Sequence, residues 1–188
     1  MDIGFFDVMM PGKNGVDSFI EIKQAHDAID AATGEERWRF ATGDMIVASP
    51  AVVESTVYIA SYDNHLYAVD LTTGEKIWEF AGNASFYASP AVANGVVFLG
   101  GVDGAFYAVD AATGALVWSA SGASAIFSTA AIENGIVYYG TIDGVVIAQD
   151  AASGTVLWVQ NAGGYVNSSP AVADGRVFAG SSVGLFAY

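Results

Sequence analysis

The sequence predicts an all-β protein built from four copies of one 40-residue sheet unit, because two signatures recur along it in a fixed register. The first signature, Ala-x-Asp-x-x-Thr-Gly-x-x-x-Trp, ends at Trp38, Trp78, Trp118 and Trp158, with Ser153 in place of Thr once. The second, Ser-Pro-Ala-Val, occupies residues 49–52, 89–92 and 169–172, and the third repeat has the weaker match Ser-Thr-Ala-Ala-Ile at 128–132. Self-similarity at a fixed period of this length is the mark of a repeat protein.

Each unit reads as four short strands joined by turns. In one copy the strands are expected at 86–92, 96–100, 106–109 and 116–119. Asn94-Gly95 and Asp103-Gly104 are strong hairpin signals, because both positions of such a turn require φ > 0. Four-stranded antiparallel sheets at a period near 40 are typical of β-propeller blades. Helical repeats of similar length need a 3.6-residue periodicity, which is absent after about residue 27.

The repeated Trp signature resembles the tryptophan-docking motif of the quinoprotein-type, or pyrroloquinoline-quinone-like (PQQ-like), β-propellers over residues 28–188. The resemblance implies that each indole packs between neighbouring blades, so Trp38, Trp78, Trp118 and Trp158 would be architectural. Relatives in this family usually have seven or eight blades, and they are often periplasmic or extracellular. They include outer-membrane assembly lipoproteins, sensor proteins and dehydrogenases that hold pyrroloquinoline quinone (PQQ) and calcium.

Three alternative assemblies are compatible with the incomplete units at the two ends of the repeat region. The fourth strand expected at 36–41 lacks its first three strands, and the strands from Tyr165 onward lack a fourth. The two pieces can close a four-bladed ring, or two chains can exchange ends in a homodimer with eight blades. The chain can also be a fragment of a longer propeller, whose open sheet edges would favour aggregation.

Residues 1–27 lie outside the repeat and are expected to form an α/β-like extension. Residues 3–7 read as a buried strand, 8–15 as a loop and 16–25 as a helix. The segment resembles the phosphoacceptor region of response-regulator receiver domains, which would make Asp7 the phosphorylated residue. The acidic pair that holds Mg²⁺ and the later Lys strand of a receiver are missing, so a degenerate remnant is expected rather than a working phosphoacceptor.

Composition and charge exclude several classes of function. The formal charge is −14 with only six Lys and Arg, which argues against nucleic acid as a partner. There is no cysteine, so thiolate chemistry is absent, and no apolar run is long enough for membrane insertion. No signal peptide is recognisable at the start, which gives a cytoplasmic location by default. The carboxylates at Asp63, Asp103 and Asp143 sit one per unit beside Asn or Gly, where turn chemistry explains them without a metal.

Positions that vary between the repeats are free to serve a ligand or partner. Just before the Ser-Pro signature lie Tyr87, Phe127, Tyr165 and Asn167, and first strands face the channel of a propeller. These four residues are the candidate rim for a protein or small-molecule ligand. The favoured function is a non-catalytic binding or scaffold module without a cofactor. A PQQ-dependent dehydrogenase with calcium, or a signalling protein with a degenerate receiver segment, is the alternative.

Overall fold

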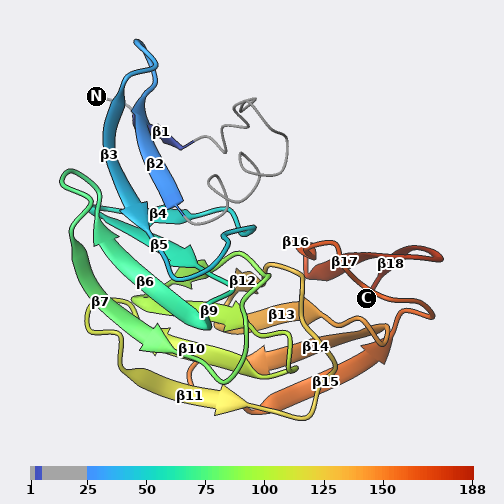
Figure 1. Cartoon of the computed structure of the whole chain (residues 1–188). Helices are drawn as coiled ribbons and strands as arrows, with labels where there is room; N and C mark the ends of the chain where they lie inside the picture. Colours follow the sequence, from blue (N-terminus) through green and yellow to red (C-terminus); the bar gives the residue numbers. More distant parts are fainter. Residues whose placement is uncertain (1–2, 6–24) are drawn as a thin grey trace.

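The computed structural model describes residues 3–5 and 25–188, and every regular element in these residues is a β-strand. The strands form five antiparallel sheets that follow one another along the chain. Figure 1 shows them as an arc, with β1–β3 at one end and β16–β18 at the other. The predicted all-β fold is therefore confirmed, and the sheets have the arrangement of propeller blades.

The first sheet is β1 (Ile3–Phe5), β2 (Ala25–Asp30) and β3 (Glu36–Ala41). The second is β4 (Ala51–Val53), β5 (Thr56–Ala60), β6 (His65–Asp70) and β7 (Lys76–Ala81). The third is β8 (Ala91–Ala93), β9 (Val96–Gly100), β10 (Phe106–Asp110) and β11 (Leu116–Ala120). The fourth is β12 (Ala131–Glu133), β13 (Ile136–Gly140), β14 (Val145–Asp150) and β15 (Val156–Asn161). The fifth is β16 (Ala171–Ala173), β17 (Arg176–Ser181) and β18 (Gly184–Ala187).

In the three four-stranded sheets the second, third and fourth strands lie where the repeat predicts them, but the first strand is much shorter than predicted. In place of a strand over 86–92, the structure has three strand residues, Ala91–Ala93. The backbone N–H of Phe86 donates to the carbonyl of Ser61 in the preceding sheet (3.2 Å) instead of pairing with β9. Pro90 has no N–H to offer a ladder. The segment before each first strand therefore joins two sheets rather than extending one.

The hairpin turns are of two kinds, and one prediction about them is wrong. Asn94 and Gly95 have φ of 50° and 75°, as a two-residue turn requires. In the second turn only Gly104 has a positive φ, of 78°, and its N–H donates to the carbonyl of Gly101 (3.1 Å). This geometry closes a loop of three residues with glycine last, so Asp103 keeps an ordinary negative φ.

The N-terminal sheet differs from the prediction in three ways. β2 begins at Ala25 rather than at Ala28, so the predicted helix over 16–25 is wrong at its last residue. The strand β3 has its own partners, because β2 pairs with it and β1 pairs with β2. In register, Ile3 lies opposite Asp30 as Thr56 lies opposite Asp70, so Ile3–Phe5 takes the place of a second blade strand. Asp7 and the rest of the predicted loop and helix lie outside the described residues.

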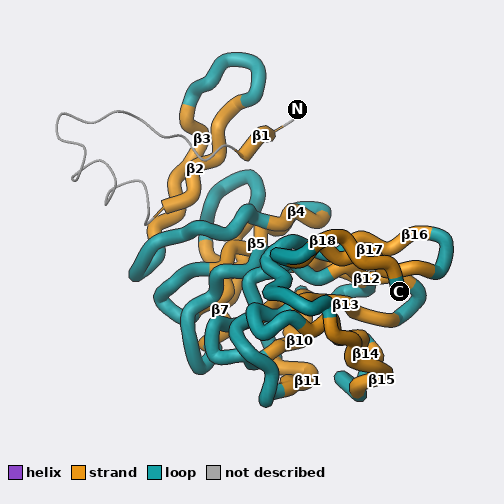
Figure 2. The backbone as a smooth tube through the Cα atoms, turned by 90° about the vertical axis from the view of Figure 1, so that its right-hand side faces the viewer, coloured by secondary structure: helices purple, strands orange, loops and turns teal. Residues whose placement is uncertain are grey.

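The sheets do not close into a ring in this structure. The inner strands β4, β8, β12 and β16 are successive neighbours, which places them along the inside of the arc. Figures 1 and 2 both show β1–β3 next to β4–β7, and β16–β18 next to β12–β15. Buried apolar clusters fill the spaces between consecutive sheets, so each sheet depends on its neighbours for a core.

The repeated Asp of each unit shapes the turn between the third and fourth strands. Asp110 Oδ1 accepts hydrogen bonds from the N–H and hydroxyl of Thr113 (2.8 and 2.7 Å). These bonds favour the carboxylate and hold the pKa of Asp110 below its ordinary value. The same turn lowers the pKa of Asp70 and Asp150. At Asp30 the main cause is the side chain of Arg37, with two backbone N–H groups, and the pKa falls to about 2.

These depressed pKa values predict acid sensitivity. A carboxylate whose pKa is lower in the folded chain stabilises it above the unfolded pKa of about 4, and this stabilisation is lost as pH falls towards the folded pKa. We therefore expect the urea midpoint to fall steadily between about pH 4 and pH 2. In Asp110→Asn, which keeps the turn acceptor without a titrating group, the fall should be shallower. An unchanged profile in that variant would mean that other carboxylates control acid unfolding.

Candidate functional site

Each of the first three tryptophans lies against the next sheet. The Nε1–H of Trp78 donates to the carbonyl of Ala111 (3.1 Å), at the turn that follows β10. The indole also lies on Gly114, where an added Cβ would come within 2.8 Å of the ring. Trp38 and Trp118 likewise donate their Nε1–H to the carbonyls of Leu71 and Ala151. The repeated Asp and Gly thus shape the turn that receives the preceding indole, and the stabilising role of these tryptophans stays a prediction until one is replaced.

Loops of two kinds build one face of the arc, which we call the loop face. It consists of the connections into the first strands (42–50, 82–90, 121–130 and 162–170) and the hairpin loops between second and third strands (61–64, 101–104, 141–144 and 182–183). The N–H of Tyr62 donates to the carbonyl of Met45 (2.9 Å), and the carbonyl of Ser61 accepts from Phe86. One hairpin loop therefore links two consecutive connections.

The connections alternate between buried and exposed side chains. Phe86 and Ala88 are buried, whereas Tyr87 between them is 44% exposed. Ile46, Val47 and Ala48 repeat the pattern in the preceding sheet. A side chain that alternates with two buried neighbours is held outward by them, because extended backbone points successive side chains to opposite sides. The register positions of Val47, Tyr87, Phe127 and Asn167 thus belong to one surface.

Three aromatic side chains form a row on the loop face. The rings of Tyr87 and Phe127 lie 4.8 Å apart between centroids, at 49°. Tyr62 meets Tyr87 edge-on at 6.1 Å. Partial burial raises the pKa of Tyr62, so its phenol stays neutral at physiological pH. The row joins three different loops and offers a rigid apolar surface with two hydroxyl groups.

The structure brings together two of the four predicted rim residues. Tyr87 and Phe127 are in contact, as described. Tyr165 and Asn167 are exposed on the connection to β16, and within the described residues no ring contact or hydrogen bond links them to the first two. Tyr62 was not predicted. The only signal for it in the sequence was the change from Tyr62 to Val102, Ile142 and Ser182 at one repeat position.

Acidic side chains are exposed on the same loop face as the aromatic row. Asp103 and Asp143 are exposed in the hairpin loops, and Asp44 is exposed in the first connection. Asp63 is engaged instead, because its Oδ2 accepts from the hydroxyl of Tyr67 (2.8 Å) and the N–H of Gly43 (2.7 Å). In residues 3–5 and 25–188, no three His, Cys, Asp or Glu side chains are grouped so that they would hold a metal ion. The described part of the chain likewise has no helix long and apolar enough to cross a membrane.

The fold and the repeated signature define a PQQ-like β-propeller. The family model described as outer membrane protein assembly factor BamB matches residues 25–129 and 107–186, and the chain belongs to this family. No curated protein sequence matches the chain.

Solved structures support the same fold. The chain is similar to BamB from Moraxella catarrhalis, with a TM-score of 0.77 and 21% identity over 88% of this chain and 55% of that one. Two computationally designed proteins are also similar. Ika8 gives a TM-score of 0.79 and 21% identity, over 87% of this chain and 52% of that one. Ika4 gives a TM-score of 0.72 and 22% identity, over 79% of this chain and 92% of that one. The chain thus spans about half the length of the first two structures.

Proposed function

We propose that the chain is a non-catalytic binding module whose loop face docks a protein. The observation that carries the proposal is the row of Tyr62, Tyr87 and Phe127. Exposed tyrosines backed by a fixed scaffold are typical of binding surfaces, because they supply contact area at little cost in conformational entropy. The description of the family as an outer membrane protein assembly factor agrees with a protein partner.

The charge around the aromatic row indicates which charge the partner's surface should carry. Asp44, Asp103 and Asp143 are exposed on the same face, and the chain carries a formal charge of −14. Complementary potentials speed association and suppress wrong partners. We therefore expect a partner that presents apolar side chains flanked by Lys or Arg, and an association rate that falls as salt is added.

Site-specific photo-crosslinking tests this proposal. A photoreactive aromatic amino acid placed at Tyr87 in cells that express the chain should yield a covalent adduct with one protein species. The matched control is Val117 on the outer strand β11, which is 49% exposed against 44% for Tyr87. The adduct should weaken when Phe127→Ala is added, because the neighbouring ring is removed. No adduct at Tyr87, or the same adducts at both positions, would reject the loop face as the docking surface.

The two other interpretations of the sequence have direct tests. A quinone-dependent dehydrogenase would bind PQQ in the presence of Ca²⁺, so titration of the chain with both should give saturable binding. We propose that it gives none, since the side chains that the connections to the first strands turn outward include Val47, Tyr87 and Phe127, which offer at most one oxygen ligand among them. A working receiver segment would be labelled at Asp7 by acetyl phosphate, and Asp7→Asn would remove the label.

A further inference from the structure

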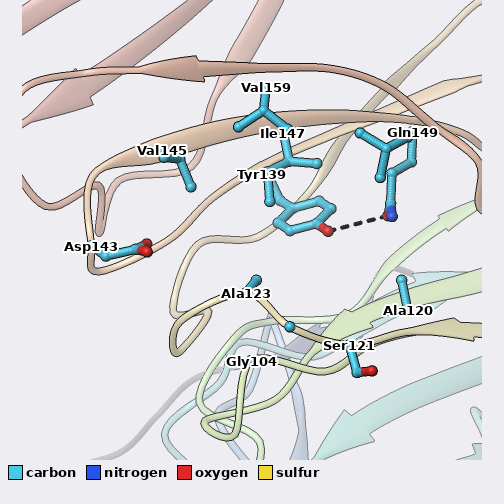
Figure 3. A pocket seen from close by; sticks show the side chains of 12 residues that line it. Gly104, Ala120, Ser121, Ala123, Tyr139, Asp143, Val145, Ile147, Gln149 and Val159 are labelled. Atoms are coloured by element: carbon cyan, nitrogen blue, oxygen red, sulfur yellow. Dashed lines mark hydrogen bonds between the residues drawn. The ribbon is translucent and has the colours of Figure 1, made fainter.

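A cavity of about 270 Å³ lies between the sheet β8–β11 and the sheet β12–β15. Figure 3 shows Ala120 and Ala123 on one side of it and Tyr139, Ile147 and Gln149 on the other. The volume exceeds the roughly 150 Å³ of an apolar cavity that holds benzene. It is just below the lower end, about 300 Å³, of small-molecule pockets.

The cavity exists because this interface lacks an aromatic pair that the two preceding interfaces contain. Phe40 packs edge-on against Tyr67 at 5.2 Å, and Phe80 packs against Tyr107 at 5.4 Å. The corresponding pair in the third interface is Ala120 and Ile147. Two large rings are thus replaced by small side chains at positions that face each other. Tyr139 fills part of the space, but it is stacked on Phe106 at 4.0 Å, deeper in the interface.

The outer wall of the cavity departs from the repeat as well. At the first interface the fourth strand of the later sheet, β7, carries an ion pair at this place, Lys76 with Glu79 (2.6 Å), and at the second interface β11 has Leu116 and Ser119 there. In β15 the same two positions are Val156 and Val159, and both line the cavity while remaining half exposed. The wall that carries an ion pair at the first interface is therefore apolar at the third.

One buried polar group faces this apolar space. Gln149 is 1% exposed, and it stands where the earlier repeats have Val69 and Val109. The hydroxyl of Tyr139 donates to its Oε1 (3.2 Å), as the dashed line in Figure 3 shows. The amide nitrogen of Gln149 has no hydrogen-bond partner within residues 25–188. This donor is open to the cavity, so a ligand that supplies an acceptor would gain by pairing with it.

We propose that this cavity is a binding site for a small neutral aromatic molecule that carries one carbonyl or amide group. The ring would occupy the space of the missing Phe–Tyr pair, between Ala120, Ile147 and the valines of β15. The carbonyl would accept from the amide of Gln149. Asp143 also lines the cavity, and the chain is strongly acidic, so a neutral ligand is favoured over an anion of the same size. The cavity shares loop residues such as Ala123 and Asp143 with the loop face, but none of the three aromatic side chains of the row lines it.

Benzamide and benzoate are suitable probes, because they share a ring and differ in charge. The measurement is a titration of the ¹⁵N-labelled chain followed by NMR, with the backbone amides of residues 121–123 as reporters in every variant and the side-chain amide of Gln149 as a further reporter where it is present. Benzamide should shift the Gln149 signal saturably, and benzoate should bind at least about tenfold more weakly. Gln149→Val, which restores the residue of the earlier repeats, should weaken benzamide by about tenfold, the value of one hydrogen bond.

A double variant, Ala120→Phe with Ile147→Tyr, rebuilds the aromatic pair of the first two interfaces and should abolish benzamide binding. If that variant does not fold, Val159→Glu, which restores the residue found at Glu79, serves the same purpose at the entrance. The proposal is overturned if benzamide shows no saturable binding at about 10 mM. It is equally overturned if binding is unchanged in Gln149→Val and in the variant that fills or charges the cavity.

Discussion

Replacing Trp78 with Ala is expected to lower the free energy of unfolding by about 3–5 kcal/mol, as for buried aromatic side chains in protein cores. The indole is buried between two sheets, lies on Gly114 and makes a tilted ring contact with Tyr58 at 5.8 Å. The carbonyl of Ala111 would keep one partner, because the hydroxyl of Tyr58 also donates to it (3.1 Å). Most of the loss should therefore come from packing rather than from an unpaired acceptor.

Urea unfolding followed by circular dichroism measures this loss, and Trp158→Ala is the matched control. Trp158 is only partly buried and contacts Tyr138 and Tyr188. In residues 25–188 its Nε1–H makes no hydrogen bond like the one from Trp78 to Ala111. We expect Trp158→Ala to lower the free energy of unfolding by less than half as much as Trp78→Ala. Unfolding of both variants is measured at two protein concentrations. A cost at Trp158 that rises with concentration would indicate a homodimer in which a second chain packs against this indole. Equal losses at both tryptophans, whatever the concentration, would contradict docking between sheets as their source of stability.

The parts of the fold that could be predicted depend on local chemistry. Asn94-Gly95 requires two positive φ values wherever it occurs, so the turn and the strands beside it follow from the sequence. The first strands could not be placed, because their length depends on which backbone groups the neighbouring sheet satisfies. Ser49, for example, donates its N–H to the hydroxyl of Ser89 in the next sheet (2.9 Å). The pairing of β1 with β2 could not be predicted either, since Ile3–Phe5 carries no signature of the repeat.

The candidate sites also divide into residues that the sequence repeat identifies and residues that only the three-dimensional contacts identify. Tyr87 and Phe127 were predicted because both vary at one repeat position, whereas Tyr62 comes from a different position and joins them only in space. The signals for the cavity were also present in the sequence, as Ala in the place of Phe40 and Phe80 and Gln in the place of Val69 and Val109. They gain meaning only when the structure shows that Ala120 and Gln149, from different sheets, line one space. Register identifies which residues differ, and packing decides which differences act together.

Gly114→Ala is expected to be the second most damaging change, and it isolates the contact between an indole and the next turn. Gly114 has φ of 75°, where a residue with a Cβ costs roughly 1–2 kcal/mol, and the added Cβ would come within 2.8 Å of the Trp78 ring. Displacing that ring should add about 1–3 kcal/mol, as overpacking does in a close-packed interior.

Gly34→Ala provides the control for Gly114→Ala. Gly34 occupies the same position of the same turn with the same φ of 75°, but no atom lies within 4 Å of its added Cβ. Urea unfolding should therefore show only the backbone cost at Gly34 and the sum of both effects at Gly114. The Trp78 fluorescence maximum should shift to longer wavelength only in Gly114→Ala, since the indole is pushed towards water. If the two variants lose the same stability and the emission stays unchanged, the glycine is needed for its backbone alone, and the indole above it contributes nothing through that contact.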